Sequence, residues 1–153
     1  MRYFNDSFLG EDIDWFALDS EGMIGHFASG GGGVPEFVDE ETTALLTDFF
    51  RSLPAVENNE VNISPQLEKY RVFISQQEKE RYLKGFIFMA QRGIYAYDKT
   101  VLGNQSDPRY HLVVVPQIEL NASEIPLSIS EKLQTVLLKR AFKEVLIVSI
   151  MDF

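Results

Sequence analysis

The chain has 153 residues and no cysteine, so it contains no disulfide, no thiolate metal site and no thiol nucleophile. Its hydrophobic content of 45% is enough for one packed core at this length, and we expect a single domain, residues 1–153, despite a net charge of −9. No apolar run approaches the roughly 20 residues of a membrane span, which together with the missing cysteine predicts a cytoplasmic protein that does not enter a membrane.

The first predicted element is a β-hairpin. Residues 14–19 and 23–28 are rich in aromatic and branched side chains and flank a three-residue loop that ends in Gly22. Glycine suits the left-handed position that closes such a loop. In the resulting register, one face carries Phe16, Leu18, Ile24 and His26, and the other carries Trp15, Ala17, Gly25 and Phe27. Both faces are apolar, so both are expected to be covered by other elements.

A helix is predicted over residues 38–53, where apolar side chains recur at helical spacing. Asp39 is the expected N-cap, Glu40 and Glu41 suit the positive end of the helix dipole, and Pro54 ends the helix. The preceding Gly30–Gly33 run is interpreted as a connector. It matches no phosphate-loop motif and is followed by acids that would repel a phosphate.

Two further helices carry capping-box patterns. The first is Ser75 with Glu78, which begins a helix that ends at Gly93. The second is Ser128 with Glu131, which begins a helix whose expected inward side chains are Leu133, Val136 and Leu137.

Strands are predicted over residues 93–98 and 110–116, and a last strand over 145–148 is apolar on both faces, as a strand inside a sheet would be. Residues 55–63 are expected to form a polar loop. Residues 65–74 stay open between a helix and a strand, since Tyr70, Val72 and Ile74 alternate. The order of elements predicts an α+β protein with a single mixed or mainly antiparallel sheet of about five strands and helices packed on it.

No motif nominates a catalytic residue, a metal ligand or a cofactor. His26 and His111 belong to no spaced ligand pattern, and the serine nucleophile elbow is absent. The alternative enzyme hypothesis is a small hydrolase or metal-dependent enzyme that uses Asp14, Asp19 and His26, and it requires these three side chains to converge in one pocket.

The negative charge is regional. Residues 1–60 contain 13 acidic and 2 basic residues, a net charge of −11, whereas residues 61–153 contain 10 and 12, a net charge of +2. Nucleic-acid binding is disfavoured because phosphate contacts need clustered Lys and Arg. An acidic surface with an aromatic anchor suits a cationic protein partner instead. The predicted partner-binding residues are Asp14, Trp15, Asp19, Glu21, Phe27, Glu36, Glu40 and Glu41.

Three segments also carry a family resemblance. They are Asp14-Trp15-Phe16-Ala17-x-Asp19-x-x-Gly22-x-Ile24-x-x-Phe27, residues 93–98, and Tyr110-x-x-Val113-x-x-Pro116. Together they resemble small uncharacterised bacterial proteins, some of which are similar to immunity proteins of polymorphic toxin systems. The resemblance implies a bacterial cytoplasmic protein and brings no catalytic residues.

The leading expectation is therefore a non-enzymatic binding protein, an immunity protein that covers a basic toxin with its acidic N-terminal region. The alternatives are the enzyme described above and a self-associating interaction module, such as a homodimer, that binds no toxin.

Overall fold

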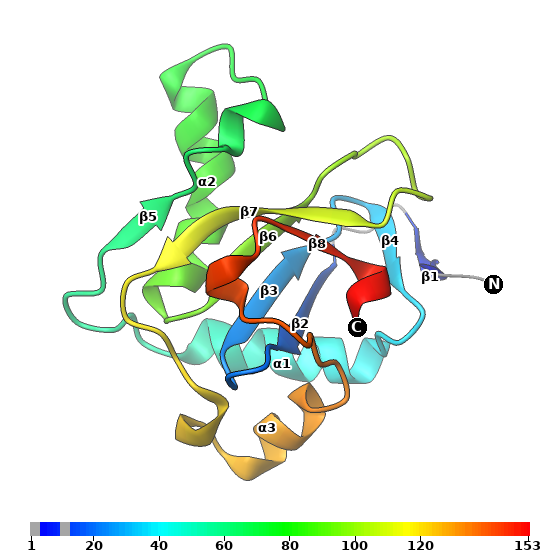
Figure 1. The fold of residues 1–153 in the computed structure, drawn as a ribbon, viewed down its shortest axis with the longest axis vertical. Coiled ribbons are helices and arrows are strands. Elements are labelled where there is room, and N and C mark those ends of the chain that lie inside the picture. The colour runs from blue at the N-terminus through cyan, green and yellow to red at the C-terminus, as the bar shows by residue number, and fades with distance from the viewer. Residues whose placement is uncertain (1–3, 10–12) are drawn as a thin grey trace.

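The computed structural model describes residues 4–9 and 13–153, which form an α+β fold around one mixed sheet (Figure 1). Its strands, in spatial order, are β2 (Asp14–Leu18), β3 (Ile24–Ala28), β6 (Tyr95–Lys99), β7 (Arg109–Pro116) and β5 (Val61–Ile63), and β8 (Ile147–Ser149) shares the outer edge of β7 with β5. The β3–β6 pair is parallel, and the other pairs are antiparallel. A separate two-stranded sheet pairs β1 (Phe4–Leu9) with β4 (Gly32–Pro35).

Helices cover one face of the main sheet. The helices α1 (Glu40–Ser52), α2 (Gln76–Gln91) and α3 (Leu127–Leu133) bury apolar side chains against that face. The chain after α3, orange to red in Figure 1, crosses the opposite face and encloses a second core that contains Trp15, Phe27 and Phe142. The expectation that both faces of the hairpin are covered is therefore confirmed.

The hairpin has the predicted register. Trp15 pairs with Phe27 and Phe16 pairs with His26 across β2 and β3. Gly22 closes the loop with a φ of 81°, in the left-handed region where a side chain would cost energy. The alternation of residues along the two strands was thus sufficient to place each side chain on its face.

The first two predicted helices are also confirmed. Asp39 caps α1 by accepting a hydrogen bond from the backbone N–H of Thr42, and Ser75 caps α2 by accepting one from Glu78. Gly93 follows α2 with a φ of 90°. The Glu78 side chain does not complete the capping box at Ser75, because its carboxylate accepts from the N–H of Ile74 instead.

The third helix differs from the prediction. It begins at Leu127 and ends at Leu133, and its N-cap is Pro126 without a side-chain hydrogen bond. A capping box lies before this helix, where Asn121 caps a short 3-10 helix and pairs with Glu124. Because the helix ends before Leu137, that side chain lies on an irregular segment and is 48% exposed, so its predicted inward position was wrong.

The strand predictions need two corrections. The last strand covers Ile147–Ser149 and lies at the edge of the sheet, where Val148 is buried and Leu146 is 49% exposed, so it is not a strand inside the sheet. Residues 55–63 contain the short edge strand β5, and the connector after β3 continues into β4. These short strands have too few residues for a clear period-two pattern.

Residues 65–74 form a 3-10 turn, Leu67–Lys69, followed by an extended segment. We call residues 70–75 the strap. The alternating apolar residues of this segment do not face the core. Val72 and Ile74 are 88% and 92% exposed, whereas Arg71 and Phe73 face the protein. Arg71 faces inward because it hydrogen-bonds within a polar cluster around Asp98.

Candidate functional site

Three exposed carboxylates and two half-exposed apolar side chains lie close together in the chain, before and within the first turns of α1. Glu36, Glu40 and Glu41 are exposed and have no hydrogen bond or ion pair with any side chain among residues 13–153. Phe37 is 41% exposed and Leu45 is 43% exposed. We call these five residues the acidic surface. Apolar side chains within a charged rim are the usual arrangement at a protein-binding patch.

Phe37 is held in place by rings of the core. Its ring packs edge-on against Trp15, with centroids 5.7 Å apart at 76°, and against Phe153 at 5.7 Å. A cavity of about 40 Å³ opens beside it and is bordered by Asp39, Thr42 and Lys132 among others. A cavity needs roughly 10–15 Å³ to hold a water, so this one has room for a water or for the end of a side chain. Phe37 is therefore a rigid exposed ring beside a small recess.

Asp39 has a structural role in the same region. Its carboxylate accepts hydrogen bonds from the hydroxyl of Thr42, at 2.6 Å, and from the backbone N–H of Thr42, at 2.9 Å. These bonds hold the pKa of the Asp39 carboxyl below its ordinary value. Asp39 thus stays ionised and fixes the end of α1 that presents Glu40 and Glu41.

The two predicted aromatic contact residues lie in the core. Trp15 is 1% exposed and Phe27 is fully buried, and their rings stack with centroids 4.2 Å apart. The indole N–H of Trp15 donates to the Tyr110 hydroxyl at 3.2 Å. Neither ring can contact a partner in this structure, so their assignment as surface anchors is corrected. Phe37, which the sequence analysis did not single out, occupies that position.

Asp19 is also buried, at 5% exposure, and it serves the fold. One carboxylate oxygen accepts from the N–H groups of Glu21 and Met23 in the hairpin loop, and the other accepts from the N–H of Phe142 at 2.8 Å. Glu21 is exposed, with its carboxylate 3.4 Å from the ammonium of Lys143. Of these two predicted contact residues, only Glu21 is available to a partner.

Replacing Asp19 with asparagine is expected to destabilise the fold by about 1–3 kcal/mol. An amide offers one acceptor oxygen, so either the loop or the buried N–H of Phe142 would face an NH₂ group instead of a carboxylate. Urea unfolding followed by circular dichroism measures the loss. The exposed neighbour variant Glu21→Gln should unfold at the wild-type midpoint, and equal midpoints for both variants would contradict the structural role of Asp19.

The enzyme hypothesis required Asp14, Asp19 and His26 to converge, and they do not. Asp14 lies 3.1 Å from the Nε2 atom of His26 without hydrogen-bond alignment, so the contact is electrostatic. Burial opposes ionisation of Asp14, but attraction to His26 and Arg51 holds the pKa of its carboxyl below the ordinary value. Asp19 lies five residues further along the chain, directly after the end of β2, about 16 Å away at roughly 3.3 Å per residue. His26 is only 4% exposed, so this trio does not form a site.

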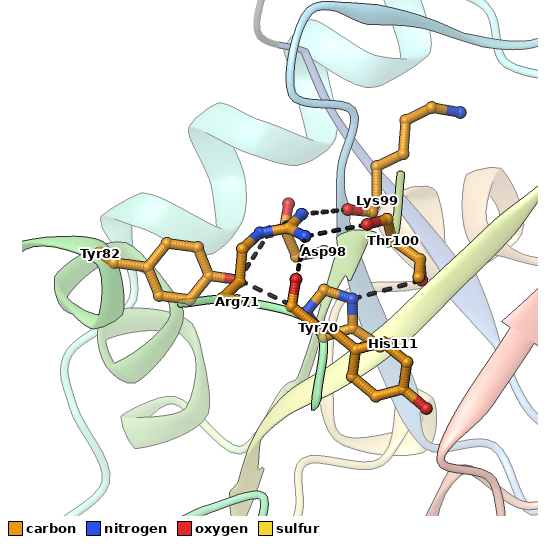
Figure 2. Close-up of polar contacts among 7 residues, drawn as sticks. All are labelled: Tyr70, Arg71, Tyr82, Asp98, Lys99, Thr100 and His111. Atoms are coloured by element: carbon orange, nitrogen blue, oxygen red, sulfur yellow. Dashed lines mark hydrogen bonds and ion pairs between the residues drawn. The ribbon is translucent and has the colours of Figure 1, made fainter. Parts of the chain in front are cut away.

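A second polar cluster, not anticipated from the sequence, lies where the strap meets the ends of β6 and β7 (Figure 2). Asp98 is its centre and accepts from the guanidinium of Arg71 at 2.9 Å and from the Tyr82 hydroxyl at 2.6 Å. Arg71 also donates to the backbone carbonyls of Tyr70, Lys99 and Thr100. One arginine thus ties the strap to the end of β6, which explains why it points inward.

His111 completes this cluster. Its ring stacks on Tyr70 with centroids 4.7 Å apart, and its Nδ1 and Nε2 atoms lie 3.3 Å from the Thr100 hydroxyl and 3.5 Å from the Tyr82 hydroxyl (Figure 2). Burial, with the nearby charge of Arg71, lowers the pKa of His111 to about 3, so the ring is neutral at physiological pH. Burial also raises the pKa of Asp98 and of Tyr82. The side chains form one connected network, in which the buried Nε atom of Arg71 has no hydrogen-bond partner among the described residues, and we interpret the network as a structural clamp.

Within the described residues, no group of three or more His, Asp or Glu side chains is arranged to hold a metal ion. None of the described helices combines the length and the apolar character that crossing a membrane requires. Comparison of the chain with family models, curated proteins and solved structures finds no match.

Proposed function

We propose that this protein is a non-enzymatic protein-binding module that recognises a cationic partner through the acidic surface, and that it acts in the bacterial cytoplasm as an immunity protein against a basic toxin. The observation that carries the proposal is the set of exposed, unpaired carboxylates of Glu36, Glu40 and Glu41, which are near the exposed Phe37 in the chain. Within residues 1–60, Asp14, Asp19, Glu21 and Asp39 each have a partner in the fold, whereas these three carboxylates face solvent.

The arrangement suits two separate steps of binding. Exposed carboxylates attract a basic surface during the diffusional encounter and raise the association rate, and this effect weakens as salt screens the charges. The Phe37 ring then loses little conformational entropy on binding, because it already packs against Trp15 and Phe153. The acids would set the rate of association, and the ring would set the lifetime of the complex.

Charge reversal of Glu36, Glu40 and Glu41 to lysine is the test. The partner in the experiment is the purified product of the gene next to the one that encodes this chain, with binding followed by surface plasmon resonance at increasing NaCl. We expect the wild-type association rate to fall with salt, and the triple variant to associate at least about tenfold more slowly at low salt. A urea unfolding curve checks that the variant is folded, since losing the helix-end acids costs about 0.3–1 kcal/mol each.

A matched control separates local from overall charge. The variant Glu57→Lys, Glu60→Lys, Glu131→Lys makes the same change in net charge at exposed positions outside the acidic surface. It should keep most of the wild-type association rate. Equal slowing by both triple variants, or binding that does not depend on salt, would contradict the proposal. No binding, combined with a concentration-dependent dimer, would favour the self-associating module.

A further inference from the structure

The outer face of α2 forms a shallow groove of opposite character to the acidic surface. Its volume is about 640 Å³, and we call it the α2 groove; its lining residues are Gln77, Glu80, Arg81, Lys84, Ile87, Phe88 and Gln91. Ile87 and Phe88 are half-buried and form an apolar floor, while the other lining side chains are exposed. The groove extends along most of the helix, so it suits an elongated ligand.

Cations line this groove and extend it at one end. Arg81 and Lys84 are exposed and make no ion pair with any residue of 13–153. At the C-terminal end of the groove, the guanidinium of Arg92 lies 3.4 Å from the centroid of the Phe88 ring, and that of Arg51 lies 5.5 Å from the same centroid. Among the lining residues the two cations Arg81 and Lys84 stand against one acid, Glu80, and Arg51 and Arg92 add two cations at the end of the groove.

Arg92 is fixed in position before any ligand binds. Its Nε atom donates to the carbonyl of Leu53 at 2.7 Å, and one terminal nitrogen donates to the carbonyl of Phe88 at 2.8 Å. The second terminal nitrogen makes no hydrogen bond with residues 13–153. Partial burial and the charge of Arg51 both lower the pKa of Arg92, as expected when two guanidinium groups lie close together. A bound carboxylate would relieve this repulsion.

We propose that the α2 groove binds an acidic segment of a partner protein, with carboxylates held by Arg51, Arg92, Arg81 and Lys84 and an apolar side chain resting on Phe88. Arginine forks match carboxylates in geometry, and the apolar floor gives a second, salt-insensitive contribution. This site is distinct from the acidic surface, which lies at the other end of α1 from Arg51, about 16 Å away along a helix that rises roughly 1.5 Å per residue.

A polypeptide fits these observations better than a nucleic acid does. Binding of a nucleic acid relies on many phosphate contacts along a basic stripe. The groove offers two lining cations, two more at its end and an apolar floor, and the rest of the chain is strongly acidic and would repel an extended polyanion. A short segment that alternates glutamate with apolar residues has the matching charge and the matching apolar contact.

The test uses a fluorescein-labelled peptide of glutamates with one central leucine, titrated with the full-length protein while fluorescence anisotropy is recorded. We expect saturable binding that weakens with NaCl, and at least about a tenfold loss of affinity in the variant Arg81→Glu, Lys84→Glu, because two attractive contacts become repulsive. Changing the central leucine of the peptide to serine should weaken binding further at high salt.

The matched control is Lys139→Glu, Arg140→Glu, which changes net charge equally at exposed positions outside the groove. It should bind the peptide nearly as the wild type does. Equal losses in both double variants, or no binding by the wild type, would overturn the proposal. So would tighter binding of a single-stranded oligonucleotide that the same groove variant abolishes. Binding of the cationic partner to the acidic surface should be unchanged in the groove variant, so the two proposals can fail separately.

Discussion

Replacement of Arg71 by methionine is expected to destabilise the protein by about 3–5 kcal/mol, because it leaves the buried carboxylate of Asp98 without its cation. Asp98 is 7% exposed and the Arg71 side chain is 13% exposed, so solvent cannot replace the lost contact. The three backbone carbonyls that Arg71 contacts would also lose their donor. Stabilities of small domains are about 5–15 kcal/mol, so this loss is a large fraction of the total.

The loss should depend on pH. Burial raises the pKa of Asp98 in the folded state, and removal of Arg71 raises it further. The folded variant then binds a proton more readily than the unfolded chain, so its stability falls as pH rises through the folded-state pKa of Asp98 and recovers at lower pH. The urea midpoint of the Arg71→Met variant should be lower than that of the wild type, and we expect the difference between the two midpoints to become smaller as the pH is lowered from neutral to acid. The milder variant Arg71→Lys keeps the charge, and the exposed-site control Lys69→Met should show no such gap.

Replacement of Trp15 by alanine is expected to cost about 3–5 kcal/mol, the range for removing a large buried aromatic side chain. Trp15 is 1% exposed and stacks on Phe27, and its removal would also leave the Tyr110 hydroxyl without its donor. Thermal unfolding measured by circular dichroism gives the loss.

Trp15 also supports the acidic surface, because its ring backs Phe37. The variant Trp15→Phe keeps a ring at this position and should lose about 1–2 kcal/mol, mainly from the cavity and the missing hydrogen bond. If Phe37 acts as the anchor, this folded variant should dissociate from the cationic partner faster than the wild type while associating at a similar rate. A change in association rate alone would contradict the role given to Phe37.

The elements that the sequence predicted well are those with local signals. The hairpin has a glycine at the left-handed loop position and a period-two pattern on both sides, and the two long helices have side-chain caps at Asp39 and Ser75. Each of these signals acts within a few residues of chain. The α+β class follows from them, and the structure confirms it with a mixed sheet of six strands.

The segments that the sequence did not predict depend on contacts between distant residues. The strap looked ambiguous because Val72 and Ile74 alternate, yet the contact that orients it is made by Arg71 with Asp98, 27 residues later in the chain. The composition of strand β8 is typical of a strand inside a sheet. In the structure β8 pairs with one end of β7 only, because β5 pairs with the other end of the same edge. No pattern within these segments carries that information.

The candidate site was predicted in part. Glu36, Glu40 and Glu41 could be nominated from charge, because acids near the start of a helix are seldom buried. The aromatic anchor could not be predicted from the sequence. Trp15 and Phe37 each lie next to an acidic residue in the chain, and only tertiary packing decides which of the two rings is covered. The one available signal was that Phe37 lies before the N-cap Asp39, outside the helical repeat that faces the core.

The parallel pairing of β3 with β6 has a consequence for the order of folding. The hairpin β2–β3 and the pair β6–β7 each join neighbouring segments, whereas the residues paired across β3 and β6 are about 70 positions apart in the chain. Closing a loop of that length lowers the conformational entropy of the chain before the stabilising contacts between β3 and β6 can form. We therefore expect the pairing of β3 with β6, at the centre of the sheet, to be the slow step in reaching the native topology.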